Sequence, residues 1–193
     1  MKKILAALLA AVAAPAFAQS NAAPGFTERD IRQEQRIEQG LQSGALTTRE
    51  AARLQREQAH IDQMQARALA DGELTAAERA RIHAAQNAAS RDIYRQKHDA
   101  QTGDPSSPSS RRLQADVARN INQEKRIQQG MASGELTNRE AARLEAGQAR
   151  IGRMEARAGR DGHVGPHEQA HIRQAQDRQS RRIYRQKHDG QRG

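Results

Sequence analysis

The chain contains an internal duplication, and this feature constrains the fold more than any other. The segment QEQRIEQGLQSGALTTREAARL begins at Gln33, and QEKRIQQGMASGELTNREAARL begins at Gln123. The heptapeptide IYRQKHD likewise begins at both Ile93 and Ile183. Both matches have the same spacing without a gap, and more than half of the paired positions are identical. Self-similarity of this kind predicts that one structural unit is built twice.

The segment between the two copies differs from both of them in composition. It reads AQTGDPSSPSS, is rich in Gly, Pro and Ser, and carries almost no apolar side chain. This composition is typical of a flexible linker, which we expect at residues 100–112. We therefore place the first three-helix repeat at 27–99 and the second at 113–190.

Residues 1–18 have the pattern of a secretory signal peptide. Lys2 and Lys3 precede an apolar run, and the small residues Ala16 and Ala18 lie just before the expected cleavage site. The run of about 15 apolar residues is short for a membrane span. We therefore expect an exported mature chain, periplasmic or secreted, without a transmembrane segment. The sequence has no cysteine, which excludes disulfides and thiolate metal sites.

Each copy contains two related octets that have the chemistry of a helix start. The four octets are SGALTTRE, DGELTAAE, SGELTNRE and DGHVGPHE. In the first three, a Thr precedes a Glu by three residues, which is the capping box; in the fourth, Gly165 takes the N-cap place before Pro166. The glycine of each octet suits the left-handed residue that ends the preceding helix.

Apolar residues after each octet recur with helical period. In the first copy they form a stripe through Leu54 and Ile61, with Gln58 on the same face. This predicts an all-α fold of two tandem three-helix units, helix-turn-helix-turn-helix. The expected helices are 28–42, 48–70 and 76–98, and the same positions shifted by one repeat. Because Leu, Ile, Val and Phe are scarce, the core of one unit would be small, so we expect the two repeats to pack together or the chain to self-associate.

The octet DGELTAAE resembles the later positions of an EF-hand calcium loop. On this resemblance the chain is similar to degenerate EF-hand-like (DGxLTxxE) repeat proteins of the bacterial envelope. The first ligand position, however, falls on Arg67 in this octet and on Arg157 in the fourth, and no octet has a side-chain oxygen at the third position. Calcium needs six to eight oxygen ligands, so we expect no calcium site in the octets and interpret Glu78 as a cap.

The pentapeptides LTTRE, LTAAE and LTNRE also resemble the Leu-Thr-x-x-Gln signature of Spy-type periplasmic chaperones, with Glu in place of Gln. This resemblance implies an exported helical protein that presents a surface to unfolded or envelope proteins. The leading hypothesis is therefore a non-enzymatic binding or envelope-stress protein with a Spy-like, client-binding role.

A histidine cluster supplies a second hypothesis, metal buffering. His163, His167 and His171 lie within nine residues, and the last two are one helical turn apart. Imidazole ligands at this spacing suit Zn, Ni or Cu. The alternative is a solvated helix start that carries scattered histidines.

The charge distribution supplies a third hypothesis, polyanion binding. Residues 27–99 carry 12 acidic and 12 basic side chains, whereas residues 111–193 carry 10 acidic and 18 basic ones. The basic residues are densest at Arg111, Arg112, Arg181 and Arg182. Nucleic acid, lipopolysaccharide or an acidic membrane surface would bind there; a solvated basic face is the alternative.

No pattern in the sequence predicts an enzyme. Ser and His occur without a nucleophile elbow, and the sequence has no phosphate loop and no dinucleotide fingerprint. We expect no catalytic residues and no cofactor apart from the metal ion considered above.

Overall fold

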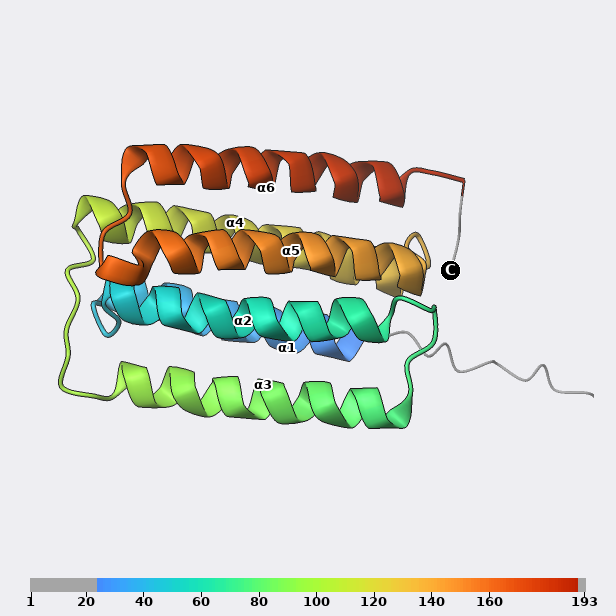
Figure 1. Cartoon of the computed structure of the whole chain (residues 1–193), viewed down its shortest axis with the longest axis horizontal. Helices are drawn as coiled ribbons and strands as arrows, with labels where there is room; N and C mark the ends of the chain where they lie inside the picture. Colours follow the sequence, from blue (N-terminus) through green and yellow to red (C-terminus); the bar gives the residue numbers. More distant parts are fainter. Residues whose placement is uncertain (1–23, 191–193) are drawn as a thin grey trace, which may run out of the picture.

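The computed structural model describes residues 24–190, and these residues form an all-α fold without strands (Figure 1). The predicted fold class is therefore confirmed. The helices are α1 (Pro24–Ser43), α2 (Thr48–Ala68), α3 (Ala76–Lys97), α4 (Pro108–Ala132), α5 (Asn138–Ala158) and α6 (Pro166–Lys187), with a 3-10 turn at Gly159–Asp161. The predicted signal peptide, residues 1–18, lies outside the described part of the chain.

The octets start helices as the sequence predicts. At the start of α2, the Thr47 side chain accepts a hydrogen bond from the Glu50 amide at 3.2 Å, and Glu50 accepts one from the Thr47 amide at 2.8 Å. The same reciprocal bonds begin α3 and α5. In the fourth octet, Glu168 accepts from the amide of Gly165 at 2.8 Å. The four octet glycines have positive φ: Gly44, Gly72, Gly134 and Gly162.

The two repeats pack against each other along their length. The most extensive contacts in the fold join α2 to α5 and α1 to α4, one helix from each repeat. The α2–α5 pair is antiparallel, since Gly152 lies against Ala59 and Gly159 lies against Ala52. Helices α3 and α6 cover opposite sides of this four-helix centre (Figure 1).

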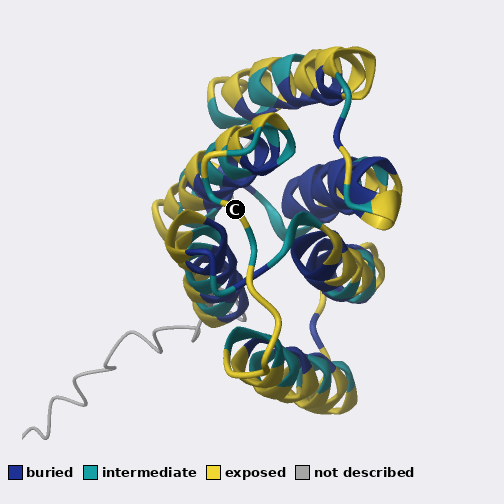
Figure 2. Cartoon of the chain, turned by 90° about the vertical axis from the view of Figure 1, so that its left-hand side faces the viewer, coloured by how far each residue is buried: buried dark blue, intermediate teal, exposed yellow. Residues whose placement is uncertain are grey.

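This arrangement shows that the two tandem three-helix repeats pack together. Both repeats contribute to one core, because the narrow apolar stripe of a single repeat leaves too little surface to bury on its own. The helix faces that point toward the centre are the buried ones, and the outer faces of α3 and α6 are exposed (Figure 2).

The linker is shorter than predicted and is held in place. Ser107 caps α4 and Pro108 is in its first turn, so residues 108–112 are helical and not part of a flexible segment. Before them, the Gly103 amide donates to the Gly44 carbonyl at 2.8 Å. A side chain at Gly103 would collide with the backbone of Leu46, so the linker packs closely on the first octet.

The core consists of two apolar clusters that lie toward opposite ends of the four-helix centre. One includes Leu41, Leu46 and Leu113, and the other includes Phe26 and Leu144. The predicted stripe residues are buried, Gln58 included, whereas Tyr94 is 59% exposed. Within residues 24–190, no helix has the combined length and hydropathy that crossing a bilayer requires.

Candidate functional site

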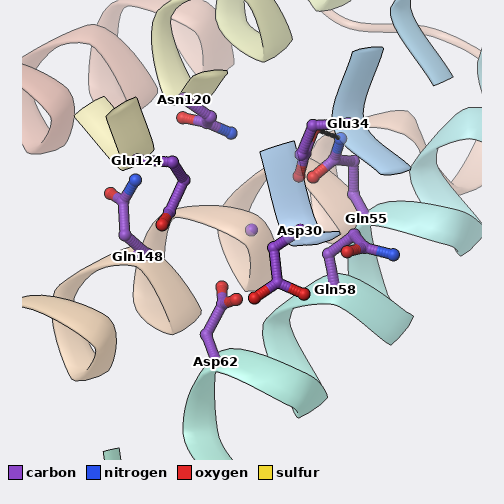
Figure 3. A pocket seen from close by; sticks show the side chains of 9 residues that line it. Asp30, Glu34, Gln55, Gln58, Asp62, Asn120, Glu124 and Gln148 are labelled. Atoms are coloured by element: carbon purple, nitrogen blue, oxygen red, sulfur yellow. Dashed lines mark hydrogen bonds between the residues drawn. The ribbon is translucent and has the colours of Figure 1, made fainter. Parts of the chain in front are cut away.

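Buried polar side chains fill the centre of the bundle, between the two apolar clusters. They come from both repeats and are mainly carboxylates and carboxamides. Those that line the central cavity are Asp30, Glu34, Gln55, Gln58, Asp62, Asn120, Glu124 and Gln148 (Figure 3). A buried polar group is costly without a partner, so the hydrogen bonds among these side chains decide what the layer can do.

In the first repeat the two central carboxylates of α1 are each paired with an amide. The Gln55 side chain donates to Glu34 at 2.8 Å, and the Gln65 side chain donates to Asp30 at 2.6 Å. Gln86 of α3 donates to the second oxygen of Asp30 at 2.8 Å. Helices α1, α2 and α3 are thereby joined by matched donors and acceptors.

The second repeat preserves one of these pairs with the partners exchanged. Asn120 and Glu155 occupy the positions of Asp30 and Gln65, and the Asn120 amide donates to Glu155 at 2.9 Å. The acid has moved from the first helix of the repeat to the middle helix, and the amide has moved the other way. The pairing therefore survives although both residues have changed.

The other pair is not preserved. Glu145 stands where the first repeat has Gln55, and it faces Glu124, the counterpart of Glu34. Asp62 of α2, whose counterpart is Gly152, adds a third carboxylate. One oxygen from each of these acids lies within 4.8 Å of the others, and all three side chains are buried. We call Asp62, Glu124 and Glu145 the carboxylate cluster.

Burial makes the charged form of these carboxyl groups unfavourable. It raises the pKa of Glu124 to about 8, with a further rise caused by Asp30, although Gln148 offsets part of it. Burial also raises the pKa values of Asp62 and Glu145 well above their usual range, and the neighbouring acids raise them further. The cluster must therefore hold either protons or a cation at neutral pH.

The cavity beside the cluster is small and contains no basic group. Its volume is about 10 Å³, which is close to the minimum that holds one water molecule. None of the lining residues is Lys, Arg or His. Gln58 lines it and is 2% exposed, yet neither its amide nitrogen nor its amide oxygen has a hydrogen-bond partner (Figure 3).

A second feature, a surface groove, distinguishes the two repeats. The groove has a volume of about 590 Å³ and runs between α2 and α3. Its floor is apolar, and its rim carries charges of both signs. The residues that line it are Arg56, Glu57, His60, Ile61, Ala85, Ala88, Ala89 and Asp92. We call it the α2–α3 groove.

In the second repeat a side chain occupies the equivalent space. Gln179, the counterpart of Ala89, reaches α5 and donates to the Leu144 carbonyl at 2.8 Å. Gly147, the counterpart of Glu57, leaves room for it, because any side chain at Gly147 would collide with Gln179. Gly147 and Gln179 thus close this space in the second repeat, whereas Glu57 and Ala89 leave it open in the first.

The predicted histidine ligands lie on the surface at the start of α6. His163, His167 and His171 are all exposed. Among residues 24–190, the carboxylate cluster is the one group of three or more candidate ligands whose atoms lie within 4.8 Å of one another. The three imidazoles are thus not grouped within this distance, and the histidine site at the start of α6 stays a prediction.

The four predicted polyanion-binding arginines do not form one patch. Arg111 and Arg112 lie at the start of α4, and the Arg112 side chain donates to the Val164 carbonyl at 2.7 Å. Arg181 and Arg182 are exposed in the second half of α6. Helices α4 and α6 run side by side in the same direction, so the two arginine pairs are far apart.

Two further motifs have structural roles. Glu78 accepts hydrogen bonds from both the amide and the hydroxyl of Thr75, and these bonds lower its pKa. The IYRQKHD motif ends α3 and α6, where Tyr94 and Tyr184 are exposed and each stacks on the histidine four residues later.

Sequence reasoning identified Gln58 as part of a buried stripe but missed the carboxylate cluster. Alignment of the two repeats does point to this cluster, because Glu145 and Asp62 are acids where the other repeat has a neutral residue. Both positions are buried in the structure. On one helix alone, however, each of them looks like an ordinary solvated acid. Comparisons with protein-family models, curated proteins and solved structures find no match to this chain.

Proposed function

We propose that this protein is an exported, non-enzymatic binding protein whose first repeat receives apolar segments of unfolded client chains. The observation that carries the proposal is the α2–α3 groove, which is open in the first repeat and closed by Gln179 in the second. A periplasmic or secreted location accords with this role and with the signal-peptide pattern of residues 1–18.

The chemistry of the groove suits a client of variable sequence. Ala85, Ala88 and Ala89 present methyl groups and no side chain long enough to fill the space, so an apolar client side chain would bury its surface there. Charged groups of both signs on the rim keep the free protein soluble and accommodate either sign of charge on the client. A floor of small side chains selects for size and apolarity and not for a particular motif.

The decisive experiment transfers the closure of the second repeat into the first. The double variant Glu57→Gly with Ala89→Gln reproduces the Gly147 and Gln179 pair. The full-length wild-type chain is expected to suppress aggregation of a chemically unfolded model client, and the double variant is expected to lose this activity. Glu57→Gly alone is the control, because it leaves the groove open and tests for the cost of glycine in a helix, about 1 kcal/mol.

The reciprocal variant gives an independent check. Gln179→Ala opens the equivalent space in the second repeat and should increase client suppression. If the wild-type chain and the double variant suppress aggregation equally, the groove has no role in client binding.

A second candidate function is metal buffering by His167 and His171. The supporting observation is that both imidazoles are exposed and one turn apart on α6, so they can bind one Zn²⁺, Ni²⁺ or Cu²⁺ ion from solution. Calorimetric titration of the wild-type chain with zinc should give heat that disappears in the double variant His167→Ala with His171→Ala. Equal heats in the two proteins would remove this candidate.

Polyanion binding stays a prediction, and it concerns the exposed arginines Arg181 and Arg182 of α6. Replacement of Arg181 and Arg182 by Gln should reduce salt-dependent retention on heparin, whereas the same change at Arg53 and Arg56 in the first repeat should have a smaller effect. Equal reductions would show a non-specific charge effect.

A further inference from the structure

We propose that Asp62, Glu124 and Glu145 bind one hard divalent cation in the core, between the two repeats. The inference is independent of the client-binding groove, which lies on the outer side of α2. Its basis is the convergence of three buried carboxylates from α2, α4 and α5, together with the unpaired amide of Gln58 in the wall of the cavity that Asp62 and Glu124 line.

The donor atoms indicate the class of ion. The cluster and the cavity wall offer carboxylate and amide oxygens, and no thiolate or imidazole lines the cavity. Oxygen donors suit Mg²⁺, Ca²⁺ and Mn²⁺, whereas Zn²⁺ and Cu²⁺ favour nitrogen and sulfur. Mg²⁺ usually keeps several of its waters, and a cavity of about 10 Å³ has no room for them. The site therefore fits Mn²⁺ or Ca²⁺ without a full hydration shell.

Gln58 is the second observation that points to a ligand. Both polar atoms of its amide are buried without a hydrogen-bond partner, as are those of Gln148 in the same cavity wall, and such buried amides normally have partners. The Gln58 carboxamide lines the cavity together with Asp62 and Glu124 (Figure 3). A bound cation would accept the amide oxygen as a further ligand and would remove the cost of leaving it unpaired.

The electrostatics of the cavity favour a cation over an internal ion pair. The cavity wall provides no Lys, Arg or His that could neutralise the three acids. Isolated buried carboxylates are strongly unfavourable, and a metal ion is one of the few groups that compensates several of them at once.

The sequence differences between the two repeats at these positions also favour a bound cation. At the first-repeat position equivalent to Glu145, Gln55 donates to Glu34 and satisfies that acid within the protein. In the second repeat the donor is replaced by an acid, and Asp62 adds another where the opposite repeat has Gly152. Both differences increase the number of oxygen ligands at one place and remove the internal alternative to a cation.

The site also spans the boundary between the repeats. Asp62 belongs to the first repeat, whereas Glu124 and Glu145 belong to the second. A cation held by all three would therefore join the repeats and stabilise the folded chain in proportion to its concentration.

Binding of Mn²⁺ to the full-length chain tests the proposal directly. The protein is unfolded in urea with a chelator, exchanged into metal-free buffer, and refolded with Mn²⁺ present, so that slow entry into the core cannot limit binding. Electron paramagnetic resonance then measures free aqueous Mn²⁺. We expect one ion to be bound per chain and Ca²⁺ to compete for the same site.

The critical variant is Glu145→Gln, which recreates the amide–acid pair of the first repeat and is nearly isosteric, so the chain is expected to fold. It should weaken Mn²⁺ binding by about tenfold or more. Gln58→Leu should also weaken binding, whereas His167→Ala with His171→Ala should leave it unchanged. Circular dichroism confirms that each variant is folded.

The proposal is overturned if refolded wild-type protein leaves all Mn²⁺ free, or if folded Glu145→Gln binds as tightly as the wild type. Binding that is lost in the histidine variant but kept in Glu145→Gln would also overturn it, because that result would place the ion on the surface of α6.

Discussion

The two repeats share an architecture of three helices and two octets, but their buried polar groups are organised differently. The first repeat matches both central acids of α1 with amides, as Gln55 does for Glu34. The second repeat keeps one such match, between Asn120 and Glu155, and replaces the other with the acids Glu124 and Glu145. At the surface the contrast is reversed, because the first repeat is open at the α2–α3 groove and the second is closed by Gln179.

In this duplicated fold, the residues that both repeats share include those that begin and end the helices. Residues shared by both repeats, such as the capping Thr–Glu pairs, specify the helices and their ends. Residues that differ between the repeats at buried or groove positions are not needed to specify the helices, so they are free to form a site. We therefore place both proposed binding sites where the repeats diverge.

The largest predicted effect concerns pH in the metal-free protein. Burial raises the pKa of Glu34 from 4.5 to about 8 and that of Glu124 similarly, so the folded chain holds protons that the unfolded chain has released. Stability should therefore fall as pH rises from about 4.5 to about 8, by up to about 5 kcal/mol for each of these two groups. Urea unfolding at several pH values, with a chelator present, measures this loss.

The same experiment on Glu145→Gln sharpens the comparison. One acid has been replaced by the amide of the first repeat, so stability should decline less with pH than in the wild type. A metal-free wild-type protein whose stability rises over this interval would contradict the raised pKa values.

The next largest effect is expected when the hydrogen-bonded pair Gln55–Glu34 of the first repeat is broken. Gln55→Glu gives the first repeat the acid that stands at position 145, and it leaves Glu34 without its donor. We expect a loss of about 3 kcal/mol at pH 7, because a buried acid would be left uncompensated. The urea midpoint reports the change. Gln42→Glu, an exposed change on α1, should cost less than about 0.5 kcal/mol.

The smallest effect concerns the helix caps. Thr137→Ala removes the hydroxyl that caps α5 in the centre of the bundle and should cost about 1 kcal/mol. Thr75→Gly gives α3 the N-cap residue that α6 already has in Gly165, and it should cost only a few tenths of a kcal/mol. Urea unfolding measures the loss of unfolding free energy in both variants. A larger loss for Thr75→Gly than for Thr137→Ala would show that the α3 cap contributes more than local hydrogen bonds.

The parts of the fold that the sequence predicted are those that depend on neighbouring residues. The Thr47–Glu50 box and the positive φ of Gly44 each involve contacts within one turn of the chain, so their chemistry can be recognised in a short segment. The sequence predicts too late a start for α4, because Ser107 and Pro108, an N-cap and first-turn pair, lie in a segment whose overall composition is that of a linker.

The sequence by itself determined the helices, their caps and the duplication, because these follow from local hydrogen bonding and periodicity. Only the tertiary structure decided that α2 packs on α5, and hence that Asp62 meets Glu124 and Glu145. Desolvation and proximity among these acids arise from packing between residues far apart in the chain. The same carboxyl groups on isolated helices would be solvated and ordinary; in the core they become the most distinctive chemistry of the molecule.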